Sequence, residues 1–289
     1  MFTYFKTPIG STKLGLVINI ILFVLKIFAG IFGRSQALLA DALNSLLDIV
    51  ANIVVWLGIR IAERPPDKDH PYGHGNADNL AAVFVAIVLT ITGIYIGSEA
   101  IDAIIHRNYQ TPTWLATAAA IFTIIVKFGL YKLTDKVGKE YNSPAVLANA
   151  QDHRSDALIS TSALFGIVVA QLGVPILDPI AGVWIALLIL KQAIKILREN
   201  VQTLMVTSPG SEFEKQITEF IHQSDGVRQV NWVRGRIVGS GYYVDIAIEV
   251  DASLTVLEGH DIAKNIRKSV NESFSSVRDV LIHINPYTD

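Results

Sequence analysis

Long apolar runs dominate the first two-thirds of the chain. A helix needs roughly 20 apolar residues to cross the hydrocarbon core of a membrane. Six segments reach that length, namely residues 12–33, 37–61, 78–100, 112–133, 145–173 and 177–197. The pattern therefore predicts six membrane-spanning helices in a transmembrane domain over residues 1–208.

The period of the pattern changes after "TSPGSEF" (residues 207–213), where polar residues become frequent. Helical periodicity appears at residues 212–223 and 255–274, and strand-like segments occur at residues 227–238, 242–251 and 277–286. The order α-β-β-α-β predicts a small ferredoxin-like domain over residues 209–289, with both helices on one face of an open sheet. The fold class is thus a membrane α-helical protein with a C-terminal α+β domain.

The composition agrees with a membrane protein. Of the 289 residues, 51% are hydrophobic and 17% are charged, whereas soluble domains carry about 25% charged residues.

No cleavage site of small residues follows the first apolar run, so we expect a retained membrane span and not a signal peptide. The sequence has no cysteine, which excludes disulfides and thiolate metal sites. It also has no basic face, nucleophile–base pair or phosphate-binding loop, which argues against a nucleic-acid partner and against an enzyme.

Lysine and arginine are distributed unequally between the loops, and this bias sets the orientation of membrane helices. If the N-terminus is cytoplasmic, the outside loops contain two basic residues, Arg34 and Arg107. The inside segments then contain eleven: Lys6, Lys13, Arg60, Arg64, Lys68, Lys132, Lys136, Lys139, Lys191, Lys195 and Arg198. We therefore expect both termini and the C-terminal domain on the cytoplasmic side.

Two predicted spans contain paired polar residues. Asn44 and Asp48 in the second span, and Asp152 and Asp156 in the fifth, are each spaced i, i+4 and share a helix face. Each pair lies about 12–18 Å from its helix start, at a rise of roughly 1.5 Å per residue. A carboxylate at that depth costs at least about 2.5–3.5 kcal/mol. Protons, Arg154 or a metal ion would compensate it; hydrogen bonds between helices or a wet crevice are the alternative interpretation.

The side chains of these four residues offer only oxygen ligands to a metal ion. Zn²⁺ favours nitrogen and sulfur in tetrahedral sites, whereas oxygen sites favour Mn²⁺, Mg²⁺ or Ca²⁺. Mg²⁺ loses its water reluctantly, which disfavours it in a site with four protein ligands. His153 and Arg154 point away from the Asp152–Asp156 face, so we expect His153 to pack or to meet water and not to bind the ion.

Four motifs resemble the cation diffusion facilitator family over nearly the whole chain. They are "SQALLADALNSLLDIVAN", "DKDHPYGHGNADNLA", "NAQDHRSDALIS" and "LDPIAG". The resemblance implies a homodimer that exports divalent metals from the cytoplasm in exchange for protons, by alternating access. Zinc members of the family place histidine at the position of Asp152. Asn44-x-x-x-Asp48 with Asp152-x-x-x-Asp156 resembles the manganese branch, with Zn²⁺, Fe²⁺ or Co²⁺ as further substrates, and an aspartate must then take up the proton.

The resemblance also implies a second metal site in the loop between the second and third spans. Asp67, His70 and His74 match metal-binding positions of some relatives. Pro71 and Gly73 argue against a continuous helix there. The alternative interpretation is a capped turn with histidines that bond the backbone.

A third site is implied in the C-terminal domain, near the interface of the homodimer. Asp245, His260 and His283 match ligand positions of related domains, and Ala247 and Asn285 replace ligands found in some zinc relatives. The alternative is that these are ordinary surface histidines.

Further charged residues lie in the predicted spans, among them Asp41 near the outer end of the second span and Lys26 in the first, to which no role is assigned. Asp178 lies at the outer end of the sixth span, where we expect it to cap a helix start. Lys127 in the fourth span is interpreted as a side chain that snorkels toward the cytoplasmic side.

The leading hypothesis is a Mn²⁺/H⁺ antiporter in the plasma (inner) membrane. The absence of a long histidine-rich loop between the fourth and fifth spans suggests a bacterial source. A zinc or iron exporter of the same family is the first alternative. A membrane-anchored metal sensor that moves no ion is the second, but a sensor would not need carboxylates at the membrane midplane.

Overall fold

The computed structural model describes residues 7–141, 143–239 and 241–288. Lys6, which contributes to the predicted charge asymmetry, lies outside these residues. The described chain forms two compact units. We call residues 7–54 with 84–197 the helical unit, and residues 55–83 with 198–288 the sheet unit.

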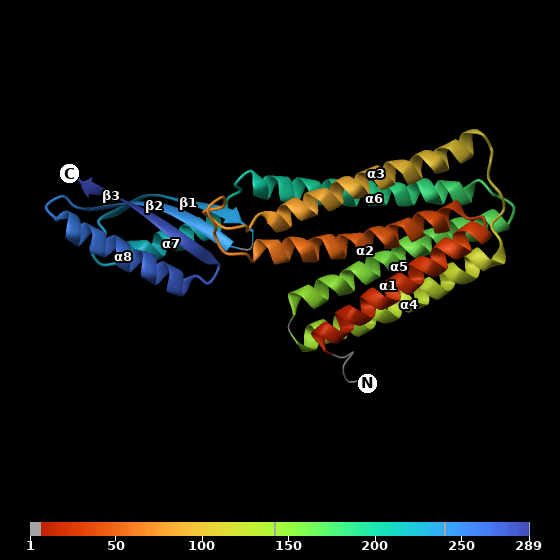
Figure 1. Cartoon of the computed structure of the whole chain (residues 1–289), viewed down its shortest axis with the longest axis horizontal. Coiled ribbons are helices and arrows are strands. Elements are labelled where there is room, and N and C mark those ends of the chain that lie inside the picture. The colour runs from red at the N-terminus through yellow and green to blue at the C-terminus, as the bar shows by residue number, and fades with distance from the viewer. Residues whose placement is uncertain (1–6, 142, 240, 289) are drawn as a thin grey trace. The chain divides into compact units, whose positions relative to one another are not determined.

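The prediction of six long helices is confirmed (Figure 1). They are α1 (Pro8–Phe32), α2 (Gln36–Ala62), α3 (Ala77–Ile105), α4 (Trp114–Glu140), α5 (Pro144–Gln171) and α6 (Leu177–Leu204). Among the described residues, five of these helices are long and apolar enough to cross a membrane. The exception is α5, which has 28 residues but contains Asp152, Arg154 and Asp156.

Small residues allow close approach between helices of the helical unit. Figure 1 shows α3 and α6 side by side, and a Cβ added at Gly93 of α3 would lie 3.0 Å from Leu190 of α6. Gly97 meets Ala186 one turn further along, at 3.5 Å from an added Cβ. Small residues at helix interfaces are typical of membrane bundles, because packing replaces the hydrophobic effect there.

The outside of the helical unit is apolar. Phe165, Leu172 and Trp114 are 68%, 80% and 76% exposed, respectively. Its interior, in contrast, contains buried charged and polar side chains, namely Lys26, Asp41, Asn44, Lys127, Asp156 and Asp178. This distribution is the reverse of that in a soluble domain and fits a bundle that faces lipid.

The C-terminal part of the sheet unit has the predicted order α-β-β-α-β. Its elements are α7 (Ser211–His222), β1 (Gln229–Val238), β2 (Gly241–Asp251), α8 (Val256–Ser273) and β3 (Val277–Tyr287). The sheet order is β1-β2-β3; β1 is antiparallel to β2, and β3 is parallel to β2. The parallel pair follows from α8, which provides the crossover that parallel strands require.

Both helices of this domain cover the same face of the sheet, as predicted. Val244, Ile246 and Ile248 of β2 pack with Ile217 of α7 and Ile266 of α8 in one core. A capping box stabilises the start of α8, where Thr255 and Glu258 bond each other's backbone N–H groups.

The loop between α2 and α3 packs against the β1–β2 hairpin within the sheet unit. The backbone N–H of Gly239 donates to Oδ1 of Asn76 at 3.3 Å. The hydroxyl of Tyr243 donates to the carbonyl of Tyr72, also at 3.3 Å. The compact unit therefore includes residues 55–83 in addition to the predicted C-terminal domain.

Candidate functional site

The first candidate site lies inside the helical unit, where α2 and α5 approach each other. The side-chain amide of Asn44 lies 3.5 Å from Oδ2 of Asp48 and 3.5 Å from Oδ1 of Asp156. Asn44 and Asp156 are 3% and 7% exposed, and Asp48 is half-buried. Asn44 and Asp48 meet because they are one turn apart on α2, as their spacing predicts.

A lysine that the sequence analysis did not place here completes this cluster. Nζ of Lys127, on α4, lies 2.5 Å from Oδ2 of Asp156 and 2.9 Å from Oδ1 of Asn19 on α1. Lys127 is fully buried and has its partners inside the bundle, so the expectation that it snorkels toward the cytoplasmic side to reach water is wrong. The sequence held a usable signal: Ala116, Ala120, Thr123, Lys127 and Leu130 form one stripe of α4, and all are buried.

The charged residues of α5 divide differently from the prediction. Asp156 is buried in the cluster, but Asp152, one turn earlier, is exposed, and Arg154 is exposed as well. His153 is only 7% exposed and packs against α1, since a Cβ added at Gly15 would lie 2.9 Å from its Nε2. The packing of His153 agrees with the sequence analysis. In this conformation Asp152 lies on the exposed part of α5, whereas Asp156 lies inside the cluster.

A second buried ion pair lies on α1 and α2. Nζ of Lys26 is 2.8 Å from Oδ1 of Asp41 and 3.0 Å from the hydroxyl of Ser45. Ser160 of α5 donates to Oδ2 of Asp41 at 2.7 Å. The side chains of Lys26 and Asp41 are both 0% exposed. The pair joins three helices, and its partners include none of the predicted metal ligands.

Asp178 caps a helix start, as predicted, but the helix is not its own. It lies in the first turn of α6, and its carboxylate accepts from the hydroxyl of Ser35 and from the backbone N–H of Gln36, both at 2.6 Å. Gln36 is the first residue of α2. A carboxylate at this position accepts a hydrogen bond from an N–H that has no partner within the helix, and the positive end of the helix dipole stabilises its negative charge.

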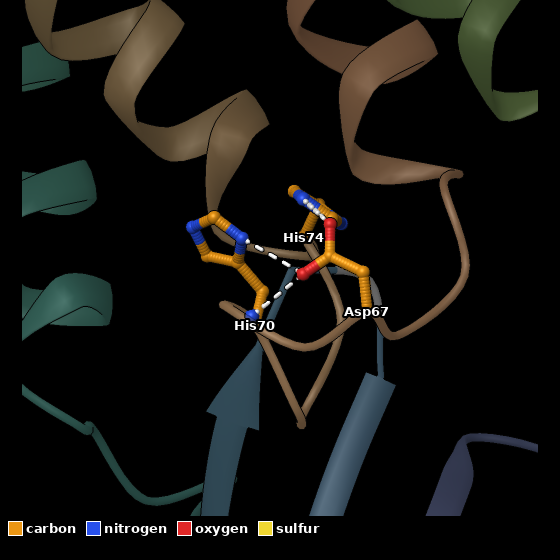
Figure 2. Close-up of side chains that lie close together, drawn as sticks. All are labelled: Asp67, His70 and His74. Carbon is orange, nitrogen blue, oxygen red and sulfur yellow. Dashed lines mark hydrogen bonds and ion pairs between the residues drawn. The ribbon is translucent and has the colours of Figure 1, made fainter.

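The second candidate site is the loop between α2 and α3 (Figure 2). Oδ1 of Asp67 lies 3.2 Å from Nδ1 of His70, and Oδ2 lies 3.4 Å from Nε2 of His74. One ligand atom from each of Asp67, His70 and His74 lies within 4.8 Å of the other two, and no other group of three histidine or acidic side chains among the described residues meets this criterion. The structure therefore brings together all three residues that the resemblance named.

The same loop also contains the capped turn that was the alternative interpretation. Oδ1 of Asp67 accepts from the backbone N–H groups of His70 (2.7 Å) and Asp69 (3.0 Å). The His70 backbone bond is the main reason why the pKa of Asp67 lies below its ordinary value. Gly73 has a φ of +83°, which turns the chain between the two histidines. The turn thus holds a charged carboxylate between two imidazoles.

The third predicted group is distributed over β2, β3 and α8. Oδ2 of Asp245 accepts from the guanidinium of Arg236 at 2.5 Å. His283 pairs with Ala247 in the β2–β3 ladder and is exposed, and His260 is exposed on α8. Gly259 of α8 lies against Ile284, whose side chain points to the face of the sheet opposite that of His283. Within one chain, the sheet therefore lies between His260 and His283. A metal site of these residues stays a prediction.

Two family models together match nearly all of this architecture. The model described as "Cation efflux transmembrane domain" matches residues 12–205, and "Cation efflux protein, cytoplasmic domain" matches residues 209–287. The chain belongs to the cation efflux family. This cation efflux protein is therefore a multi-pass membrane transporter that exports divalent metal cations, as the resemblance implied.

Curated relatives of this cation efflux protein come from bacteria, plants and an archaeon. It is 37% identical to the manganese efflux system protein MneP of Bacillus subtilis, over 95% of this chain and 94% of the relative. It is 34% identical to the magnetosome protein MamB of Magnetospira sp. (strain QH-2), over 89% and 88%. It is 35% identical to metal tolerance protein 2 of Oryza sativa subsp. japonica, over 94% and 77%.

Proposed function

We propose that the protein exports Mn²⁺ from the cytoplasm in exchange for protons, with Asn44, Asp48, Asp152 and Asp156 as the transport site. The observation that carries the proposal is the convergence of Asn44, Asp48 and Asp156 inside the bundle. Their side chains offer oxygen and no imidazole or thiolate, which suits Mn²⁺ better than Zn²⁺. The likeness to a manganese efflux protein supports the same ion.

The exposed position of Asp152 has a role in this cycle. Asp152 lies one helical turn from Asp156, so it is the ligand that first meets an ion approaching along α5. Completion of the site then requires α5 to bring Asp152 toward Asn44 and Asp48. When the site opens to the opposite side, protons replace the metal on the carboxylates, and the ion leaves.

From the distribution of Lys and Arg we place both termini in the cytoplasm. The absence of a long histidine-rich loop between the fourth and fifth spans favours a bacterial protein, which we place in the plasma membrane. A second copy of the chain pairs through the C-terminal domain to form a homodimer. In that dimer, Asp245, His260 and His283 of the two chains together form the metal site near the interface.

The proposed substrate is tested by transport in proteoliposomes with Mn²⁺, Zn²⁺ and Fe²⁺ under an imposed pH gradient. We expect the transport rate to be highest for Mn²⁺. Protons should move across the membrane in the direction opposite to that of Mn²⁺. In the same assay, Asp152→His introduces an imidazole ligand and is expected to shift the preference toward Zn²⁺ by about tenfold or more. A Zn²⁺ preference of the unmodified protein, or an unchanged profile in the variant, would contradict the oxygen-ligand argument.

We also propose that Asp67, His70 and His74 hold a second metal ion. Asp67→Asn keeps an oxygen that accepts the backbone bonds of the turn but removes the charge. We expect the variant to bind one Mn²⁺ fewer per chain, as measured by elemental analysis of the purified protein. Asp69→Asn is the matched control, since its carboxylate is in the same loop but outside the group. Equal metal content in both variants would argue for a capped turn alone.

A further inference from the structure

We propose that Lys127 is a tethered counter-ion of the transport site, which occupies Asp156 in the absence of metal and is displaced when a divalent cation binds. The inference rests on the transport site proposed above. It adds a positive group that competes with the substrate and is not itself a metal ligand.

The geometry divides the two oxygens of Asp156 between two partners. Oδ2 is 2.5 Å from Nζ of Lys127, and Oδ1 faces the amide of Asn44 at 3.5 Å. A metal held by Asn44, Asp48 and Asp156 therefore finds one oxygen of Asp156 engaged by an ammonium group. Bidentate binding by Asp156 requires that the lysine withdraw.

Asn19 gives the ammonium group a second partner. Its Oδ1 lies 2.9 Å from Nζ, on the α1 side of the cluster, and Asn19 is 6% exposed. When the metal takes Oδ2 of Asp156, the lysine keeps this hydrogen bond in the interior of the bundle. The displaced charge thus remains close enough to return to Asp156 after the metal has left.

The charges of the cluster favour a divalent ion. Once Asp152 joins the site, as the proposed cycle requires, the ionised carboxylates of Asp48, Asp152 and Asp156 contribute three negative charges and Lys127 one positive charge, which leaves a net charge of −2. One divalent cation makes the sum zero, whereas a monovalent cation leaves −1. Uncompensated charge is costly in the low-dielectric interior. Lys127 therefore limits binding of the metal to a strength that still permits release.

Lys26 is a second buried lysine of the bundle, but it is not paired with a proposed metal ligand. Its partners are Asp41 and Ser45, and neither belongs to the proposed ligands. It is equally buried and equally paired. Removal of the Lys26–Asp41 pair is therefore a matched control for removal of the Lys127 charge.

The first test measures Mn²⁺ binding to the full-length protein in detergent by calorimetry. Lys127→Met and Lys127→Gln remove a positive charge a few ångströms from the metal. We expect at least about tenfold tighter binding, together with a lower maximal transport rate because release slows. The double variant Lys26→Met/Asp41→Asn should bind Mn²⁺ as the unmodified protein does. Unchanged or weaker binding in both Lys127 variants would overturn the proposal.

A metal-free measurement tests the ion pair itself. We expect Lys127→Met and Asp156→Asn each to lower the thermal unfolding midpoint, because each leaves a buried partner unpaired. The double variant should recover a large part of that loss, and strictly additive shifts would overturn the pairing.

Failure of the inference and failure of the proposed function give different results. If Asp156→Asn loses Mn²⁺ binding but Lys127→Met binds like the unmodified protein, only the counter-ion role is wrong. If Asp156→Asn retains normal binding, the proposed transport site is wrong, and the exchange with Lys127 is wrong with it.

Discussion

Asp156→Ala is expected to abolish Mn²⁺ export. Loss of a group that only supports a metal ligand costs about 10–100-fold, and Asp156 is proposed as a ligand itself, so we expect a loss beyond that range. The variant removes the carboxylate that contacts both Asn44 and Lys127. Transport is measured in proteoliposomes that contain a Mn²⁺-sensitive dye.

A loss of folding must be separated from this loss of transport. Asp156→Ala leaves Lys127 buried without its counter-ion, which costs about 3–5 kcal/mol in other proteins. The thermal unfolding midpoint of each purified variant is therefore recorded beside the transport rate. Asp102→Ala is the matched control, because the side chain of Asp102 is 65% exposed near the end of α3. Normal transport by a folded Asp156→Ala protein would rule out the proposed site.

Asp41→Ala is expected to cause the largest loss of stability among changes outside the transport site. It leaves Lys26 at 0% exposure with Ser45 as its remaining partner within the described chain. Breaking a buried pair from one side costs about 3–5 kcal/mol, because the other charge stays in the interior. The free energy of unfolding in detergent measures the effect.

The double variant Lys26→Met/Asp41→Ala tests the cause of that loss. An apolar side chain in place of the lysine removes the unpaired charge, so we expect most of the stability to return. Metal binding should change little in the double variant, since it removes one charge of each sign and no hydrogen bond or ion pair of the described residues joins Lys26 or Asp41 to Asn44, Asp48 or Asp156. A double variant as unstable as Asp41→Ala would show that the loss arises from the hydrogen bond with Ser160 or from packing.

Local patterns predicted most of the architecture. The six apolar runs correspond to α1–α6, and the α-β-β-α-β order of the C-terminal domain is that of the structure. The i, i+4 spacing correctly placed Asn44 beside Asp48. The spacing of Asp67, His70 and His74 was less informative, and the family resemblance identified that group, which the turn at Gly73 then brings together.

The errors concern side chains whose environment depends on other helices. Lys127 was expected to snorkel because a lysine near the end of an apolar run commonly reaches water. In the structure a carboxylate from α5 and an amide from α1 make the interior favourable for it instead. Asp152 and Asp156 share one face of an isolated helix, but the packing of α5 buries the second and exposes the first.

By itself, the sequence determined the number and order of the elements, the membrane location of the long helices and the family. These follow from the length and period of apolar runs, which are properties of consecutive residues. Only the tertiary structure decided which charges meet: Lys127 with Asp156, Lys26 with Asp41, and Asp178 with the start of α2. A buried charge requires a partner, and the rotation and approach of neighbouring helices select that partner from residues distant in the sequence.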